Sequence, residues 1–153
     1  MRTAVRAIII KDNNLLVMDR NKFGHRYVAL IGGGVEVNEG LEAALVREVR
    51  EETSIEITNL RLVIEEDAGN VYGLQYIYLC DWVSGEPKLE SDSIEAKITA
   101  DGKNIYTPKW LPLSELPNTK LLPSELKELL LKFIDSGFPD KPTKLSIARD
   151  SEL

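Results

Sequence analysis

The sequence is poor in the residues that build disulfides, zinc sites and membrane spans. Its 153 residues include one cysteine and one histidine. Cys80 cannot form a disulfide within the chain, and its apolar surroundings favour a buried structural thiol over a nucleophile. His25 has no second histidine or cysteine at ligand spacing, which argues against a zinc site. The apolar run at residues 7–10 is too short for a signal peptide or a membrane span. We therefore expect a protein of the reducing cytoplasm.

Positive charge is also scarce. The 19 Lys and Arg residues are outnumbered by 25 Asp and Glu residues, which leaves a formal net charge of −6. Nucleic-acid backbones and anionic membranes are bound by clustered Lys and Arg, so we expect neither as a partner. Small phosphorylated molecules remain acceptable partners, because a bound metal ion can invert the local charge. A chain of this length holds one ordinary hydrophobic core, and we expect a single domain over residues 1–153.

Alternating and β-branched apolar residues predict a protein built mainly from strands. The expected strands are residues 3–10, 15–18, 27–31, 60–66, 71–83 and 105–111. The polar stretch 19–27 is expected to form a loop near the functional site. Tyr72 is expected on an apolar stripe that faces the core.

Two helices are expected, at residues 40–53 and 123–137, with Asn38 as the N-cap of the first. Residues 84–104 hold five acids between two convincing strands, which predicts a functional or a mobile loop. The last residues, 138–153, carry two prolines and many charges, which predicts a loosely held tail.

What the sequence does contain is a glycine-rich turn followed by a helix that ends in carboxylates, residues 33–55. Glu48, Glu51 and Glu52 fall at i, i+3 and i+4, so their side chains leave one side of the helix together. Such like charges repel by roughly 0.2–0.5 kcal/mol per pair and oppose the helix macrodipole. A hard divalent cation such as Mg²⁺ would explain them. The alternative is a solvated acidic face that neighbouring arginines partly neutralise.

The spacing of this stretch resembles the signature of the Nudix hydrolases. Gly33 is followed after five residues by Glu39, and after seven more by Arg47-Glu48-Val49-x-Glu51-Glu52. Every charged position of that signature is matched. A lone glycine pair or a lone pair of glutamates would be far less specific.

The sequence departs from the family pattern at three positions. Ile31 stands where the family usually has proline, Asn38 where it often has glycine, and Ser54 where it nearly always has glycine. None of the three removes a carboxylate. Ser54 follows the helix, where a positive φ is common and costs a non-glycine residue roughly 1–2 kcal/mol.

The resemblance implies an α/β fold, a Nudix-type α/β/α sandwich with a mixed β-sheet between helices. It also implies Mg²⁺-dependent hydrolysis, with Mn²⁺ as the alternative ion, of a nucleoside diphosphate linked to another group. In that reaction water attacks a phosphorus atom while cations neutralise the phosphate oxygens and a carboxylate takes the proton. The expected partner is a small nucleotide or dinucleoside polyphosphate.

The residues that the resemblance assigns to the metal are Gly33, Glu48, Glu51 and Glu52. The residues assigned to catalysis are Glu39, Arg47, Glu51, Glu52 and Glu95. Glu51 is a metal ligand or orients the water, and Arg47 pairs with Glu39 or Glu51. Glu95 comes from the acidic loop, and its alternative is a solvated residue that only keeps the protein soluble.

Four residues are candidates for binding the substrate. They are Arg20, Arg26, Tyr27 and Tyr72. The first three lie in the polar stretch and could meet phosphate or base, although an ordinary surface position is at least as good an explanation for each. Tyr72 lies where Nudix enzymes that act on dinucleoside polyphosphates tend to carry a tyrosine, although an aromatic strand supplies one there by chance.

Two rival functions and the oligomeric state remain open. One rival is a non-catalytic Nudix-like module that binds a nucleotide, which would not need the full set of carboxylates. The other is an isomerase of diphosphate esters on the same fold. The sequence leaves both a monomer and a homodimer open.

Overall fold

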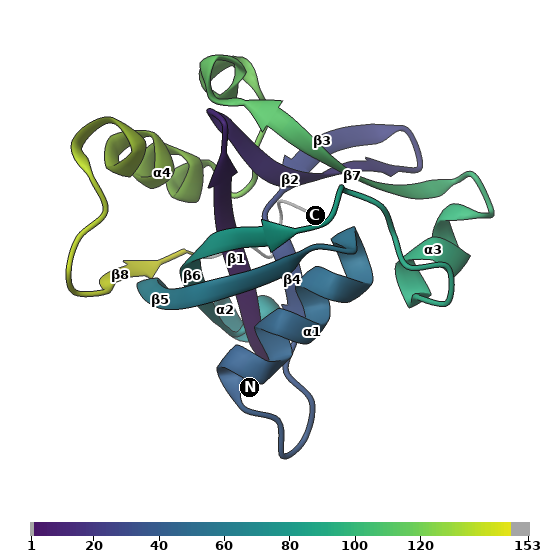
Figure 1. The fold of residues 1–153 in the computed structure, drawn as a ribbon, viewed down its shortest axis with the longest axis horizontal. Coiled ribbons are helices and arrows are strands. Elements are labelled where there is room, and N and C mark those ends of the chain that lie inside the picture. Colours follow the sequence, from purple (N-terminus) through teal and green to yellow (C-terminus); the bar gives the residue numbers. More distant parts are fainter. Residues whose placement is uncertain (1, 148–153) are drawn as a thin grey trace.

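The structure is a computed structural model that describes residues 2–147 of the chain. Figure 1 shows its strands gathered in the middle and its helices around them. The strands are β1 (Thr3–Lys11), β2 (Asn14–Lys22), β3 (His25–Ala29), β4 (Ile31–Gly34), β5 (Glu56–Asp67), β6 (Leu74–Ser84), β7 (Asn104–Pro112) and β8 (Thr143–Ser146). The helices are α1 (Leu41–Thr53), α2 (Gly69–Tyr72), α3 (Ile94–Thr99), α4 (Ser124–Ser136) and the 3₁₀-helix η1 (Leu113–Asn118).

The strands form one mixed sheet in the order β3-β2-β1-β6-β5-β8, with β4 also paired to β1 and β7 to β2. β1 is antiparallel to β2 and β4 but parallel to β6, where Thr3 lies opposite Leu74 and Ile9 opposite Cys80. Its nearly continuous apolar sequence suits this position, because a strand covered on both faces needs no polar side. β1 therefore joins the two halves of the sheet.

Hydrophobic residues pack on both faces of the sheet, and each face is covered by one long helix (Figure 1). Leu45 and Val49 of α1 share one core with Ile9, while Leu130 of α4 shares the other with Ile8. Neighbouring residues of β1 thus point into opposite cores, as the alternation of strand side chains requires. This arrangement confirms the predicted α/β sandwich with a mixed sheet between helices.

The polar stretch at residues 19–27 is not a loop, and that prediction was wrong. β2 continues to Lys22 and turns into β3 through Phe23 and Gly24, whose φ angles are 53° and 88°. The strand carries polar residues because it pairs with β3 on one side and β7 on the other. Its backbone hydrogen bonds are therefore satisfied without an apolar side-chain pattern.

Tyr72 is not on a strand either. It ends the short helix α2, in which the N–H of Gly73 donates to the carbonyl of Gly69 at 2.8 Å. That closed turn delays the start of β6 until Leu74. Beyond this point the predicted stripe holds, since Tyr78 and Cys80 are buried in the core beneath α1.

The segment after α4 is held more firmly than the sequence suggests. The rings of Phe133 and Phe138 lie 5.6 Å apart between centroids, and β8 pairs in parallel with β5. Residues 148–153, the rest of the predicted tail, lie outside the described residues. None of the helices within residues 2–147 is both long and apolar enough to cross a membrane.

Candidate active site

The predicted N-cap of α1 was wrong by two residues, and the helix begins at Leu41, one residue after the predicted start. Gly40, with φ −73° and ψ 156°, is the N-cap, whereas Asn38 has a φ of 64° in the turn before it. A short amide side chain tolerates that left-handed conformation, which explains why asparagine occurs there without capping the helix. The end of the helix is as predicted. Ser54 has a φ of 61°, and its N–H donates to the carbonyl of Arg50 at 2.9 Å.

Two carboxylates of α1, those of Glu48 and Glu52, face one pocket beside the glycine turn. Both are buried, and the N–H of Gly32 donates to Oε2 of Glu52 at 3.0 Å. A Cβ atom on Gly33 would lie 2.7 Å from the Glu48 carboxylate, closer than real Cβ contacts come. A side chain at position 33 would therefore displace this carboxylate from its place against the backbone.

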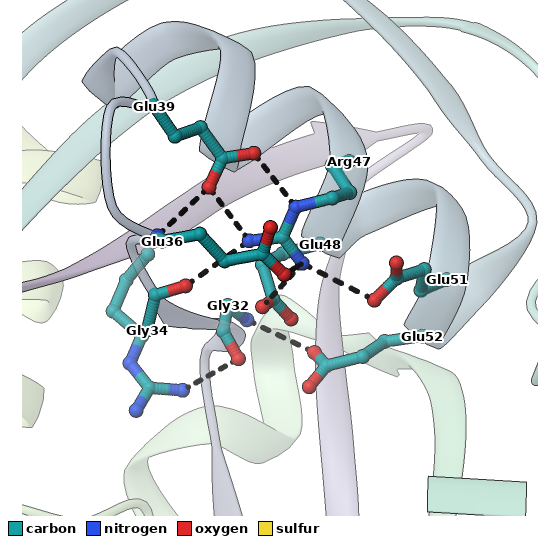
Figure 2. A network of polar contacts seen from close by, with 9 residues as sticks. Gly32, Gly34, Glu36, Glu39, Arg47, Glu48, Glu51 and Glu52 are labelled. Atoms are coloured by element: carbon teal, nitrogen blue, oxygen red, sulfur yellow. Dashed lines mark hydrogen bonds and ion pairs between the residues drawn. The ribbon is translucent and has the colours of Figure 1, made fainter. Parts of the chain in front are cut away.

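Arg47 donates hydrogen bonds to three carboxylates and one carbonyl (Figure 2). Its Nε and Nη2 donate to the two oxygens of Glu39 at 2.7 and 2.9 Å, and Nη2 also donates to the carbonyl of Gly34 at 3.1 Å. Its Nη1 lies 3.0 Å from Glu48 and 3.3 Å from Glu51. Arg47 thus fixes the helix to the loop that precedes it, and the predicted pairings with Glu39 and Glu51 both occur.

Glu39 shows how strong that pairing is. The hydrogen bonds from Arg47 and the backbone N–H of Glu36 lower the pKa of Glu39 to about 2. The hydrogen bonds to Glu39 and the nearby Glu48 raise the pKa of the Arg47 guanidinium, which stays charged. Glu39 is therefore ionised at every physiological pH and accepts hydrogen bonds from Arg47 as a charged group.

Glu51 is separated from the other two carboxylates of the helix. Its side chain is 43% exposed and turns toward Arg47, and it does not line the pocket that Glu48 and Glu52 share. Viewed down the helix axis, Glu48 and Glu52 lie closer to each other in angle than either lies to Glu51. The structure thus brings together Glu48, Glu52 and Gly33 of the expected metal residues and leaves Glu51 at the rim.

Burial disfavours the charged forms of the two carboxylates in the wall formed by Glu48 and Glu52. Burial raises the pKa of Glu52 well above its usual value, and Glu48 and Glu95 raise it further, although Arg6 opposes them. Burial also raises the pKa of Glu48, against the effect of Arg47. Carboxylates in this state favour either a proton or a cation.

Glu95 lines the same pocket as Glu48 and Glu52, although it is far from them in sequence. It sits in the first turn of α3, which Ser93 caps by accepting the N–H of Ala96 at 3.0 Å. The other acids of the loop do not line this pocket; they are Glu86, Glu90, Asp92 and Asp101. Of the five acids in residues 84–104, Glu95 lines the pocket, and it is the one that the sequence favoured.

The opposite wall combines a cation with aromatic rings. Arg20 lies opposite Tyr27 on β3 and opposite Tyr106 on β7 in the sheet register. Its guanidinium carbon is 3.6 Å from the centroid of the Tyr106 ring, and Nη1 donates to the hydroxyl of Tyr27 at 3.3 Å. Nη2 donates to Oδ1 of Asn104 at 2.5 Å. The planar guanidinium is thus fixed by its neighbours before any ligand arrives.

Arg26 and Tyr72 differ in how close they come to this wall. Arg26 points to the other face of the hairpin, where it is exposed and pairs with Asp19 at 3.1 Å. Tyr72 does line the pocket, from α2. The pocket has a volume of about 340 Å³.

Arg6 and Tyr106 are among the pocket residues that sequence reasoning missed. Nη1 of Arg6 donates to the carbonyl of Gly32 at 3.1 Å and so supports the glycine turn from β1. Its signal was a charged residue inside an otherwise apolar strand. Tyr106 gave a weaker signal, one polar aromatic ring in an alternating strand, which does not distinguish a pocket wall from a surface.

The chemistry of this carboxylate wall fits a hard divalent ion, which prefers oxygen ligands. Among residues 2–147 no three side chains of the ligating kinds are gathered closely enough to enclose an ion. The donors that fit are Glu48 and Glu52, with Glu95 facing them.

Comparison with known proteins places this geometry in context. A family model described as the NUDIX domain matches residues 1–133. The curated protein "NAD-capped RNA hydrolase NudC" of Photorhabdus laumondii is 31% identical over 109 residues, 71% of this chain. The protein of the same name from Klebsiella pneumoniae is 30% identical over 109 residues. The chain spans 38% of the length of both relatives.

Solved structures show the same fold. The MutT NUDIX hydrolase from Burkholderia pseudomallei is 26% identical, with a TM-score of 0.62 over 85% of this chain and 97% of that one. An ADP-ribose pyrophosphatase from Streptococcus suis is 18% identical, with a TM-score of 0.66 over 95% of this chain and 98% of that one.

Proposed function

This chain belongs to the NUDIX domain family, and on that premise we propose that it hydrolyses a phosphoanhydride bond in a small nucleotide. The substrate is a nucleoside diphosphate linked to another group, and the reaction depends on Mg²⁺ or Mn²⁺. One observation carries the proposal. Two buried carboxylates, Glu48 and Glu52, share a pocket with a third from a distant loop, Glu95, opposite the stacked guanidinium of Arg20.

Glu48 and Glu52 are the proposed metal ligands. The Gly33 turn brings the backbone to them, and substrate phosphate and water would complete the coordination of an ion held there. Such an ion would supply positive charge to the phosphate oxygens and would lower the pKa of water. Glu51 belongs to the rim of this site. Because it contacts Arg47, its proposed role is to hold the arginine and to orient water.

Glu95 is the proposed proton acceptor. In the hydrolytic step the oxygen of a water molecule forms a bond to phosphorus, and the bond from phosphorus to the bridging oxygen breaks. The bridging oxygen keeps that electron pair and leaves as part of a phosphate, and the proton of the water passes to a carboxylate. A general base must reach the attacking water, and Glu95 faces the pocket from outside the metal-binding helix.

Arg47 and Glu39 position these groups and do not take part in the step itself. Their paired hydrogen bonds fix the start of α1 to the glycine turn, so Glu48 and Gly33 keep their close approach. Preorganised geometry of this kind is worth more in a site that excludes water than in solution.

The remaining part of the nucleotide meets the opposite wall. Arg20 offers a charged donor, and Tyr27 and Tyr106 flank it with aromatic rings. A phosphate or a base can use such a wall, by hydrogen bonding or by stacking. Tyr72 adds a ring from α2. Arg26 is dropped from the proposed substrate residues, because it faces away and pairs with Asp19.

A small molecule, rather than nucleic acid, is the proposed partner. The name of the curated relatives includes a capped RNA, and the substrate of those proteins is therefore a competing candidate. The net charge of −6 disfavours long polyanions on this chain. We also propose that residues 1–153 act as a single domain in the reducing cytoplasm, with the oligomeric state open between monomer and homodimer.

A panel of substrates tests the proposal. ADP-ribose, dinucleoside polyphosphates, nucleoside triphosphates, nucleotide sugars and a short NAD-capped RNA are incubated with Mg²⁺ or Mn²⁺, and phosphate products are separated by chromatography. We expect turnover of at least one small nucleotide and weaker turnover of the RNA. Water labelled with ¹⁸O then identifies the phosphorus atom that is attacked.

Two results would contradict this proposal in different ways. Tight nucleotide binding with no turnover of any member, at any concentration of either ion, supports the non-catalytic binding module. Faster turnover of the capped RNA than of every small nucleotide keeps the enzyme but replaces its substrate.

A further inference from the structure

The acidic segment 84–104 is hydrogen-bonded to the end of α1, the helix that carries the carboxylates. The N–H of Lys88 donates to the carbonyl of Thr53 at 2.9 Å, and the N–H of Glu90 donates to the carbonyl of Glu51 at 3.0 Å. The last carbonyls of a helix have no partner within it. The segment donates hydrogen bonds to two of these carbonyls and is thereby attached to the end of α1.

The hydroxyl of Ser54 adds a third contact in the reverse direction. Its Oγ donates to the carbonyl of Lys88 at 2.5 Å. Position 54 has a φ of 61°, which glycine adopts without strain, yet glycine has no side chain to donate. Ser54 therefore adopts a backbone conformation that is unfavourable for serine, and its side chain makes a hydrogen bond that glycine could not make.

The backbone is tightly packed where this contact forms. A Cβ atom on Gly85, whose φ is 100°, would lie 2.4 Å from the carbonyl oxygen of Ser54. The carbonyl of Gly85 accepts the indole N–H of Trp82 at 2.9 Å. The segment thus leaves β6 against Ser54 itself, and its starting point is fixed.

A short series of contacts leads from this clasp to Glu95. The N–H of Ser93 donates to the carbonyl of Glu90 at 3.0 Å, and the buried Ser93 hydroxyl caps α3. Glu95 follows in the first turn of α3. At the far end of that helix, the hydroxyl oxygen of Thr99 accepts the N–H of Tyr106 at 3.0 Å.

We propose that Ser54 is a positioning residue whose hydroxyl, by clasping Lys88 to the end of α1, sets the Glu95 carboxylate against Glu48 and Glu52. This inference rests on the proposed function. The clasp starts from the helix that carries two of the three carboxylates, since α1 holds Glu48 and Glu52 and ends next to Ser54. Movement of the segment therefore changes the separation between Glu95 and the other two carboxylates.

Three variants test the clasp. Ser54→Gly keeps the backbone conformation and removes the donor, and Ser54→Asn keeps a donor on a residue that tolerates positive φ. Asn59→Gly is the matched control, because Asn59 also has a positive φ, 52°, and its side chain bonds Asp81 away from the pocket. Thermal denaturation first establishes that all three fold.

Amide hydrogen exchange gives a readout that needs no substrate. We expect Ser54→Gly to accelerate exchange in residues 86–96 and nowhere else, and Ser54→Asn to restore protection. We expect Ser54→Gly to lower kcat about tenfold with little change in KM, less than the roughly 10²-fold that a 1 Å displacement can cost. Asn59→Gly should change neither.

A double-mutant cycle decides whether Ser54 acts through Glu95. If it does, Ser54→Gly lowers kcat in the native background but not in the Glu95→Gln background. Equal losses in both backgrounds overturn the proposal, as does unchanged exchange in residues 86–96. If the unmutated protein turns over no substrate, the proposed function fails, and the exchange data alone decide whether the clasp exists.

Discussion

The environment of the Glu52 carboxylate differs strongly from that of an acid on the protein surface. It is 6% exposed, it accepts one backbone N–H, and burial raises its pKa well above the usual value. A group of this kind costs stability when it is ionised without a cation. The residue is therefore hard to explain by folding and easy to explain by ion binding.

Replacing that carboxylate by its amide separates the two effects. We expect Glu52→Gln to reduce metal-dependent turnover by at least 10²-fold, because the isosteric amide removes an anionic ligand. In the absence of metal the variant should be at least as stable as the native protein, because a buried charge is lost. Steady-state kinetics and thermal denaturation with and without Mg²⁺ measure both. Turnover within tenfold of native would remove Glu52 from the metal site.

Glu39 makes the opposite kind of contribution, which depends on pH. Its folded pKa, about 2, lies below its ordinary value of 4.5, so the folded state binds a proton less readily than the unfolded state does. The stabilisation is fully present above pH 4.5 and is lost as the pH falls through 2.

Glu39→Gln should therefore lower stability at pH 7, with a difference from native that shrinks as the pH falls from 4.5 toward 2. Chemical denaturation at a series of pH values measures it. Glu36→Gln is the control, since Glu36 is exposed and lies 3.9 Å from Arg47. A difference that grows toward acid pH contradicts the assigned direction of the pKa change.

At the scale of single residues, the sequence predicted some local features correctly and missed others. The positive φ of Ser54 followed from its place after a helix, and the pairing of Arg47 followed from the resemblance to the family signature. Asn38 misled because asparagine serves both N-caps and left-handed turns. Whether Glu51 faces the pocket or the rim depends on the rotation of the helix, which tertiary packing decides.

At the scale of elements, α3 is the part that brings a distant acid to the site. Glu95→Gln should lower turnover at saturating Mg²⁺ by roughly 10²–10⁴-fold, the range expected for a general acid or base. The exposed acids Glu86, Asp92 and Asp101 supply matched controls when each is changed to its amide. If a control loses activity instead, the loop is catalytic through another residue.

The β2–β3 hairpin shows why a strand beside a pocket is hard to recognise. Its residues pair in register with β7, so Arg20 and Tyr106 share the face that lines the pocket. A strand whose face meets a polar ligand needs polar side chains, and these are the same residues that mark loops in a sequence. Hydrophobic periodicity therefore does not identify a strand whose side chains line a polar pocket.

At the scale of the molecule, the two cores lie on opposite faces of the sheet, which has a measurable consequence. Leu45 and Leu130 are fully buried in different cores. Each change to alanine should cost about 2–5 kcal/mol of unfolding free energy. Because the sites share no partner, the double variant should lose the sum within about 0.5 kcal/mol, as measured by urea denaturation. A larger deviation would mean that β1 transmits strain between the cores.

The family and the general architecture could be predicted from one charged spacing, because residues 33–55 combine a close backbone approach with an ordered set of carboxylates. The sheet order could not. The pairing of β1 with β6 and of β5 with β8 joins segments that have no shared local pattern. Such pairings are selected by which hydrophobic faces meet, and a linear sequence does not display that choice.

The parallel partner of β1 also sets the order of events while the chain is being synthesised. Thr3 cannot pair with Leu74 until the ribosome has added the residues between them. At 5–20 residues per second this takes roughly 4–14 s. Throughout that interval one edge of a highly apolar nascent strand has no partner of its own, and such edges recruit strands from other chains. We therefore expect β1, at the centre of the finished sheet, to be open to pairing with other chains during synthesis.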